Sequence, residues 1–441
     1  MAPRRVCAFA APIRSCFEES FSVSNSRDMT SLQRVIVAAT LAWGVSVGHA
    51  QIDPSKRELI QLGYNLPLEG NGPLSAYAFY YLNLPRFVRT NLTLRLAVAP
   101  VYLDSELGIS QLLGPQTDFG IGIAGGGFAD TYSEVRRGRY IQAESFTGHG
   151  AGASASIYHL FNPGDRIPLN GVFRLESHSS FYERDGKTAP NFQLPDDRTS
   201  FNLRTGLRWG GREPLMLSAF AMEISGWYEA ELRSKPGPYG FPSASDPSER
   251  DRRVQQLAHL FWARALLAYT FEKWKHNLSA SLTLGTSIDS DRFSAYRLGG
   301  VLPLAAEFPL TLPGYIFQEI SAKDFALLGI NYSLPLDRAD RWAINALVTT
   351  AGVNYISGLE QPGNWHSGVG GGIRFRSKSD AWQVVLGYAY GVDAIRKGGR
   401  GAHSVGILVQ FDLERANVSL FEPGENPIRS RGLQHILGNF F

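Results

Sequence analysis

Residues that could do chemistry stand together between positions 176 and 179. Glu176, Ser177, His178 and Ser179 supply an acid, a base and two hydroxyl nucleophiles, which are the components of a Ser–His–acid hydrolase. A catalytic triad needs all its partners within hydrogen-bond reach, but neighbouring residues of an extended strand point to opposite faces. Both serines would then lie on the face opposite His178. The pattern favours ion pairs over catalysis, and we expect no enzymatic activity.

The same stretch alternates charged and apolar residues, which predicts a strand. Arg174, Glu176 and His178 share one face, and Phe173 and Leu175 occupy the other. A charged side chain facing lipid is costly at the centre of a bilayer, so in a membrane protein the charged face must line a lumen. The lumen-facing set predicted in this way also contains three arginines, Arg204, Arg208 and Arg264.

Two other patterns are weaker candidates for chemistry. The Gly-rich segment 120–127 could cradle a phosphate, but no Gly-Lys-Ser/Thr follows it. Small residues at a barrel kink or under a packed loop explain it better. The basic run 136–139 could contact lipopolysaccharide phosphates or could be solvated in a loop. No pattern indicates a cofactor or a metal, and we expect neither.

Composition favours one large β structure. Glycine is abundant, and aromatic residues make up 12% and charged residues 19% of the 441 positions. The net charge of +3 is too small to indicate a nucleic-acid partner. No window reaches the roughly 18–20 consecutive apolar residues that a membrane helix needs. Any membrane span must therefore consist of strands.

The longest apolar run, 35–48, has the features of a secretory signal peptide. Arg34 precedes it, small residues follow it, and Ala50 ends the expected cleavage site. Met29 is a natural start for such a signal. Residues 29–50 are therefore interpreted as the signal peptide, and the upstream residues 1–28 as a misassigned extension.

Cleavage after Ala50 has a chemical consequence. Both cysteines, Cys7 and Cys16, precede the cleavage site. The mature chain from Gln51 would then have no disulfide, thiol or cysteine–zinc chemistry available to it.

Sixteen segments from position 58 onward are predicted to be strands by period-two alternation and by the turn residues between them. In the last segment, Val409 and Phe411 share an apolar face opposite Gly406. Repeated segments of about ten residues with one apolar face are typical of a transmembrane antiparallel β-barrel, here of about 16 strands. The predicted strands are 58–67, 74–84, 92–103, 107–113, 118–128, 151–161, 171–182, 200–209, 215–232, 260–273, 277–288, 325–336, 342–356, 368–375, 382–392 and 403–413.

The links between the predicted strands alternate in length. Every second link is short, as at 86–91, 337–341 and 377–381, whereas the intervening links include 130–150, 183–199, 233–259 and 289–324. Short turns on one side and long loops on the other are typical of an outer-membrane barrel in Gram-negative bacteria, with the long loops outside. The predicted barrel domain spans residues 51–414, and the loops place it in the cell outer membrane.

The block 298–413 resembles the C-terminal barrel of the BamA/TamA family, in the superfamily of surface antigens and two-partner-secretion transporters. In that family a Leu-Gly-Gly opens the sixth outer loop, whose Arg-Gly-Tyr/Phe tip folds back into the lumen. The last strand carries a signal that the barrel-assembly machinery reads. The matching residues here are Leu298, Gly299 and Gly300 for the loop start, Pro313, Gly314 and Tyr315 for the tip, and Gly406, Val409 and Phe411 for the signal.

Three departures from the family pattern affect what the resemblance implies. Pro313 stands in place of the tip arginine, and Thr350 in place of its partner aspartate. The residues between Gln51 and Arg57 leave no room for the POTRA domains of most members, so we expect a barrel without them. Packing and backbone hydrogen bonds, rather than the family's ion pair, are then expected to hold the sixth loop in the lumen with Tyr315 near its tip.

Three functions remain open from the sequence. The first is a barrel that handles protein or lipid, with the sixth loop and a weak seam between the first and last strands as its working parts. Its expected partners are outer-membrane lipids, lipopolysaccharide and, during biogenesis, the barrel-assembly machinery. The second is a passive porin-like channel with selectivity set by its arginines, and the third is an outer-membrane lipid hydrolase. We expect a monomer, and a periplasmic tail at 415–441 rather than a lumen plug or a replacement final strand.

Overall fold

The structure is a computed structural model of the 441-residue chain. It describes residues 55–100, 102–165, 167–211, 220–241, 252–271, 273–300, 309–397 and 399–416. The predicted upstream extension 1–28, the signal peptide 29–50 and the tail beyond Ala416 lie outside these residues, so those predictions stay untested.

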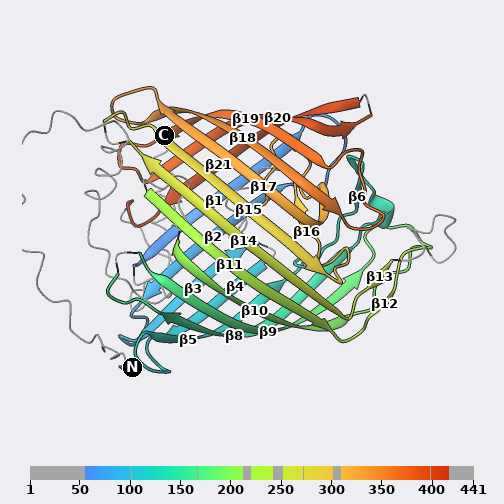
Figure 1. The fold of residues 1–441 in the computed structure, drawn as a ribbon, viewed down its shortest axis with the longest axis horizontal. Helices are drawn as coiled ribbons and strands as arrows, with labels where there is room; N and C mark the ends of the chain where they lie inside the picture. Colours follow the sequence, from blue (N-terminus) through green and yellow to red (C-terminus); the bar gives the residue numbers. More distant parts are fainter. Residues whose placement is uncertain are drawn as a thin grey trace, which may run out of the picture. The chain divides into compact units, whose positions relative to one another are not determined.

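The described residues form one closed antiparallel barrel of sixteen strands, which confirms the predicted fold class (Figure 1). Each strand pairs with its neighbour in sequence, as expected where apolar and polar residues alternate along every segment. The barrel strands are β1 (Arg57–Pro67), β2 (Ala76–Pro85), β3 (Leu92–Ala99), β4 (Tyr102–Ile109), β5 (Thr117–Gly126), β8 (Thr147–Leu160), β9 (Leu169–Glu183), β10 (Arg198–Gly211), β11 (Phe220–Arg233), β14 (Leu257–Thr270), β15 (Asn277–Ile288), β17 (Ile320–Pro335), β18 (Trp342–Tyr355), β19 (Trp365–Arg376), β20 (Trp382–Arg396) and β21 (Gly399–Asp412).

The first and last strands close the barrel. Residues 59–67 of β1 pair with residues 404–412 of β21 over nine residue pairs. The next pairings along the sheet, β1 with β2 and β2 with β3, have eight and six pairs. The interpretation of the closing seam as a weak one finds no support in this pairing.

The two ends of the barrel differ, as the loop lengths predicted. One end, called here the long-loop end, carries connections 127–146, 184–197, 234–256 and 289–319. The other, the short-turn end, carries turns such as 86–91, 336–341 and 377–381. The minor elements belong to the long loops: β6 (Val135–Arg136), β7 (Arg139–Tyr140), η1 (Gln142–Glu144), β12 (Gly237–Pro238), β13 (Arg253–Val254) and β16 (Tyr296–Leu298).

The outer face of the barrel is apolar and its inner face is polar. Leu175, Phe201 and Ile224 each expose half or more of their surface on the outer face. Their neighbours in sequence point inward, as Glu223 does beside Ile224. Glu223 is buried in the lumen, and so is Arg264 of the next strand. An apolar outer face with a polar lumen is the pattern of a barrel embedded in lipid. No helix of the described residues is long and apolar enough to cross a membrane.

The boundary between β3 and β4 was predicted wrongly. The expected strands 92–103 and 107–113 are in fact β3, ending at Ala99, and β4, spanning 102–109. Pro100 follows β3, and a proline has no backbone N–H to donate to the ladder, so the strand ends before it. Leu112 and Leu113 instead lie in the turn at the short-turn end, where each exposes 53% of its surface.

Candidate functional site

A segment between β15 and β17 folds into the barrel. Its described parts, 296–300 and 309–319, are called here the in-folded segment. They meet where the Gly299 amide donates to the Leu310 carbonyl at 3.1 Å. Leu298, Leu312 and Tyr315 are buried and pack with inward side chains of the barrel wall, including Phe325, Leu327, Ala351 and Val353. The barrel interior therefore covers apolar side chains that water would not solvate favourably.

The tip of the in-folded segment lies directly on the backbone of the wall. Gly314 has a φ of +84°, and a Cβ built there would lie 1.9 Å from the amide nitrogen of Gly391 on β20. A Cβ built on Gly368 of β19 would lie 2.2 Å from the Pro313 carbonyl oxygen. Only glycine tolerates both the left-handed conformation and so close an approach. The predicted tip residues thus contact β19, whose residues 368 and 370–372 are glycines.

The Tyr315 hydroxyl takes part in a chain of polar contacts with two side chains of the barrel wall. Its hydroxyl lies 3.3 Å from Nδ1 of the buried His366, and the two rings meet edge to face. Nε2 of His366 lies 2.5 Å from the Tyr355 hydroxyl. Because each buried polar group has a partner, the tyrosine fixes the position of the segment as well as filling space.

A buried ion pair holds the end of the in-folded segment. Arg396 of β20 donates through both terminal nitrogens to the two carboxylate oxygens of Glu319, at 2.9 and 3.0 Å. The same carboxylate accepts the Ile316 amide at 2.7 Å. Two parallel charge-assisted bonds fix orientation as well as distance. An ion pair at other positions than those of the family therefore joins the packing in holding the segment.

This pair was not predicted, because it lies away from residues 313 and 350, where the resemblance places the family's ion pair. Thr350, matched there to the family's aspartate, points to the outer face, where its hydroxyl lies 3.1 Å from that of Ser367. It cannot reach the lumen. A usable signal was present: Glu319 is the first charged residue after a long apolar stretch, and a buried charge needs a partner.

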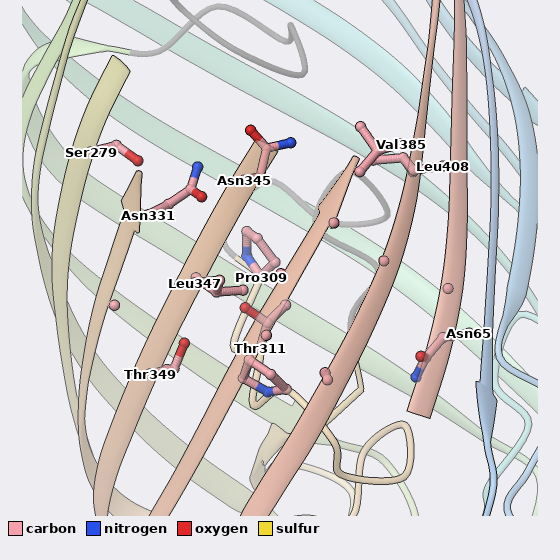
Figure 2. A pocket seen from close by; sticks show the side chains of 18 of the residues that line it. Asn65, Ser279, Pro309, Thr311, Asn331, Asn345, Leu347, Thr349, Val385 and Leu408 are labelled. Carbon is pink, nitrogen blue, oxygen red and sulfur yellow. The ribbon is translucent and has the colours of Figure 1, made fainter. Parts of the chain in front are cut away.

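The in-folded segment borders two chambers within the lumen. The inner chamber, of about 290 Å³, lies beside Pro309, Thr311 and Pro313 (Figure 2). The mouth chamber, of about 680 Å³, is lined by the 292–297 part of the connection and by inward residues of β9 and β10. Within the described residues the in-folded segment thus lies beside both spaces and occupies part of the lumen.

The predicted lumen-facing residues all point inward, and most of them are paired. Arg208 and Arg264 both lie 3.4 Å from the buried Glu223 carboxylate. Arg204 lies 3.2 Å from Glu229 and above the ring of Trp227. The arginines therefore belong to ion-pair networks across neighbouring strands.

The remaining predicted residues of this set line the mouth chamber. Arg174 donates to the Ser154 hydroxyl at 3.0 Å. Nε2 of His178 lies 2.8 Å from Asp130, and its Nδ1 lies 4.0 Å from Glu176. His178 thus ties β9 to the loop that follows β5.

The components of the hydrolase triad do not meet. Ser179 lies on the outer face, where its hydroxyl is 3.0 Å from that of Thr199. Ser177 shares that face, and His178 points into the lumen.

No group of three or more potential metal-ligating side chains occurs among the described residues.

The predicted final-strand signal lies on the closing strand. Val409 and Phe411 face outward opposite Leu62 and Ile60 of β1, and Gly406 faces inward opposite Asn65. Phe411 lies next to the last residue of β21, near the short-turn end.

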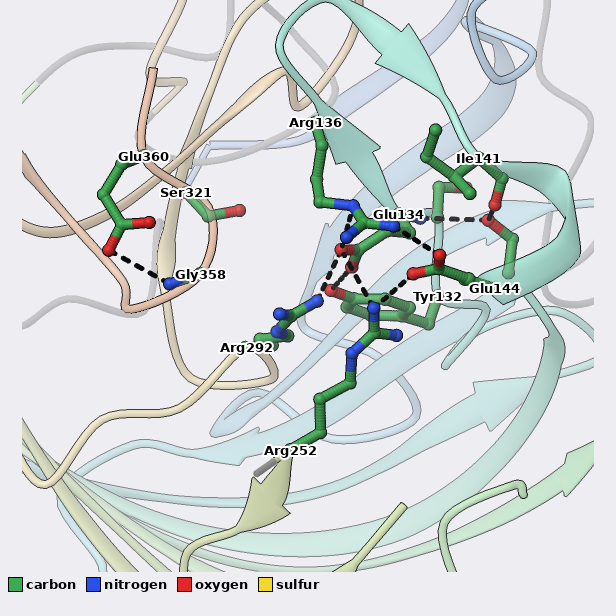
Figure 3. Close-up of polar contacts among 12 residues, drawn as sticks. Tyr132, Glu134, Arg136, Ile141, Glu144, Arg252, Arg292, Ser321, Gly358 and Glu360 are labelled. Atoms are coloured by element: carbon green, nitrogen blue, oxygen red, sulfur yellow. Dashed lines mark hydrogen bonds and ion pairs between the residues drawn. The ribbon is translucent and has the colours of Figure 1, made fainter. Parts of the chain in front are cut away.

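Three long loops meet in a buried cluster of charges at the long-loop end (Figure 3). Glu134 is fully buried and pairs with Arg292, with Arg136 at 3.4 Å and with Arg252 at 3.8 Å. Glu144 pairs with Arg136 and Arg252. The five residues come from connections 127–146, 234–256 and 289–319, so their ion pairs join separate loops into one cap.

The cap also contains packed aromatic rings and contacts strand β20. Its aromatic cluster includes Tyr132, Phe146, Phe192 and Tyr239, and Arg252 lies over the Phe192 ring. At its edge, a Cβ on Gly138 would lie 1.8 Å from the Ile395 carbonyl of β20. Within the basic run 136–139, Arg136 is held by two glutamates, whereas Arg137 and Arg139 are exposed.

The charge cluster predicts an acid-sensitive cap. Burial acts to raise the pKa of the Glu134 carboxyl, but Arg292, Arg252 and Arg136 outweigh it and lower that pKa below its usual 4.5. The resulting stabilisation is present above the usual pKa and is lost as the pH falls through the lowered one. Amide hydrogen exchange in residues 132–146, corrected for intrinsic rates, should therefore accelerate only below about pH 4.5.

The matched control is Glu134→Gln, which cannot titrate. Its exchange should already be fast at neutral pH and should change little on acidification. Equal acid responses in the wild type and the variant would show that another group controls the cap.

Sixteen antiparallel strands, an apolar outer face and a polar lumen define this chain as a β-barrel of the outer-membrane type. No family model and no curated protein matches its sequence. Solved structures match its fold. The chain is similar to CdiB from Escherichia coli, with a TM-score of 0.51 and 12% identity over 81% of this chain and 64% of that one.

The chain is also similar to BamA from Haemophilus ducreyi lacking POTRA domains 1–3, with a TM-score of 0.50 and 11% identity over 81% of this chain and 70% of that one. For CdiB from Acinetobacter baumannii the values are 0.49 and 11%, over 81% of this chain and 60% of that one. The chain thus spans less than two thirds of either CdiB. At these identities the likeness shows the fold, which is that of the BamA and CdiB barrels.

Proposed function

We propose that this chain is an outer-membrane barrel of the BamA/TamA type that takes part in assembling or translocating protein or lipid at the outer membrane. Residues 29–50 would direct it there as a signal peptide cleaved after Ala50. The barrel-assembly machinery would insert it, and outer-membrane lipids and lipopolysaccharide would surround it. It would act as a monomer.

The observation that carries this proposal is the occupied lumen. The in-folded segment contacts the wall at Gly368 and Gly391 and is held by the buried pair of Glu319 and Arg396. A segment fixed inside the barrel narrows the path for free diffusion. A barrel that handles a substrate needs an interior that stays closed at rest, and this arrangement supports such a role.

The pairing of the lumen arginines argues against the porin-like alternative. A selectivity ring needs a net field in the pore. Arg204, Arg208 and Arg264 instead lie within 3.4 Å of Glu229 or Glu223, and these two carboxylates offset most of the charge of the three arginines. The hydrolase alternative has less support still, because His178 binds Asp130 and faces away from both neighbouring serines. We therefore propose no enzymatic activity.

Single-channel conductance in planar bilayers separates the proposed function from the porin alternative. The wild-type barrel should conduct weakly and unsteadily, because the in-folded segment blocks the lumen. Replacing residues 299–318 with a Gly-Ser linker should produce a large and steady conductance. The control replaces the turn 86–91 at the short-turn end with a linker of equal length, which should leave conductance low. A wild-type channel already large and steady would favour the porin and overturn the proposal.

A further inference from the structure

Arg198 is an unusual arginine at the start of β10. It exposes only 6% of its surface, and it stands opposite Ser180 of β9 on the inner face. Its guanidinium carbon lies 5.1 Å from the centre of the Tyr182 ring and 4.4 Å from that of Phe293. One terminal nitrogen, Nη2, donates to the Tyr182 hydroxyl at 2.7 Å. Two aromatic rings and one neutral hydroxyl are its surroundings.

The charge of Arg198 has no counter-ion among the described residues. No carboxylate oxygen there lies within 4.0 Å of it, and its buried Nη1 has no hydrogen-bond partner. The nearby buried arginines are different: Arg233 pairs with Glu231 and Asp291, and Arg252 with Glu144. A buried charge without a partner is costly, so the protein gains stability if an anion completes the site.

A space for such an anion adjoins the residue. Arg198 lines the mouth chamber of about 680 Å³, a volume typical of sites for small ligands. Arg174 lines the same chamber with a buried Nε that has no partner, and it forms no ion pair within the part of the chain that the structure describes. Between Arg198 on β10 and Arg174 on β9, the inner face carries Ser200 and Asn202 on β10, with His178 and Glu176 opposite them on β9. Hydroxyl and amide donors therefore lie closest to Arg198, and the Glu176 carboxylate lies further inward.

We propose that the mouth chamber binds a phosphate group at Arg198, either as a free anion or as the headgroup of a lipid. The planar edge of a guanidinium matches a phosphate, whose several acceptor oxygens can use this group and a neighbouring donor together. The rings of Tyr182 and Phe293 shield the site from water, which strengthens the charge interaction. This site does not depend on the proposed function of the barrel.

The test measures phosphate binding to the purified full-length barrel in detergent micelles by equilibrium dialysis with radiolabelled inorganic phosphate. Chloride replaces phosphate at equal ionic strength in the reference samples. We expect one saturable site in the wild type, and Arg198→Gln should weaken it by roughly tenfold or more, because it removes a charge-assisted hydrogen bond. Arg184→Gln is the matched control: this exposed arginine donates to the Ala189 carbonyl, and binding should not change.

Competition with dihexanoyl phosphatidic acid distinguishes the two sources of phosphate. Displacement at concentrations well below those of inorganic phosphate would assign the site to a lipid headgroup, and equal or weaker competition to the free anion. Unsaturable binding, or equal binding by the wild type and Arg198→Gln, would overturn the site.

A second measurement covers the case in which Arg198→Gln does not fold. Phenylglyoxal modification of the wild-type barrel is then followed by mass spectrometry at Arg198 and Arg184. Slower modification of Arg198 alone in the presence of phosphate supports the site. The same rate with and without phosphate rejects it.

Discussion

Replacing Glu319 with glutamine should lower the free energy of unfolding of the barrel by roughly 3–5 kcal/mol. The reason is the buried partner that remains. Arg396 donates both terminal nitrogens to this carboxylate, and its side chain is only 5% exposed. A neutral amide cannot balance the charge, so the pair either separates or keeps an unpaired cation in a dry environment.

The same substitution should release the in-folded segment. A cysteine at Thr311 reports its position, since the chain has no cysteine beyond Cys16. Thr311 faces the inner chamber, so a bulky maleimide should label it slowly in the wild-type background and quickly with Glu319→Gln. Unfolding is measured in the same samples by heat-modifiable migration on gels.

Glu360→Gln is the matched control for Glu319→Gln. Glu360 accepts the Gly358 amide at 3.0 Å on an exposed loop nearby, so its loss should change stability by less than about 0.5 kcal/mol (Figure 3). Removing both Glu319 and Arg396 should cost less than the sum of the single changes, because no unpaired charge is then left. Slow labelling of residue 311 in Glu319→Gln would show that packing alone holds the segment.

The strands were predictable because their signal is local. Alternation at period two follows from the geometry of an extended chain, and it gave β15 to the residue, at 277–288. The order of short and long links is equally readable along the chain. The predicted strand 92–103 was too long because its apolar alternation continues past Pro100, whereas a proline has no backbone N–H to donate to the sheet.

The ion pairs of the site could not be predicted in the same way. Glu319 and Arg396 are 77 positions apart, and Glu134 and Arg292 are 158 positions apart. Nothing in local alternation determines which charges meet after the sheet has closed and the loops have folded over it. The sequence could indicate that an apolar loop must be covered, and that buried charges need partners, but the partners depend on the three-dimensional arrangement.

The second large effect is expected at the tip of the in-folded segment, which Gly314→Ala should displace from the wall. The φ of Gly314 is +84°, which disfavours any residue with a Cβ by about 1–2 kcal/mol. The added methyl group would also lie 1.9 Å from the amide nitrogen of Gly391, a backbone atom that cannot move without bending β20. Overpacking of this kind costs about a further 1–3 kcal/mol.

The cause can be tested from the other side of the contact. Gly368→Ala leaves the segment unchanged but puts a Cβ 2.2 Å from the Pro313 carbonyl oxygen, so it should speed maleimide labelling at residue 311 as Gly314→Ala does. Gly387→Ala is the matched control on the same inner wall, because a Cβ there meets nothing closer than 3.6 Å. Equal labelling in all three variants would mean that the tip does not depend on contact with the wall. Fast labelling in Gly314→Ala and Gly368→Ala alone would establish that the bare backbone of β19 and β20 is the surface that holds it.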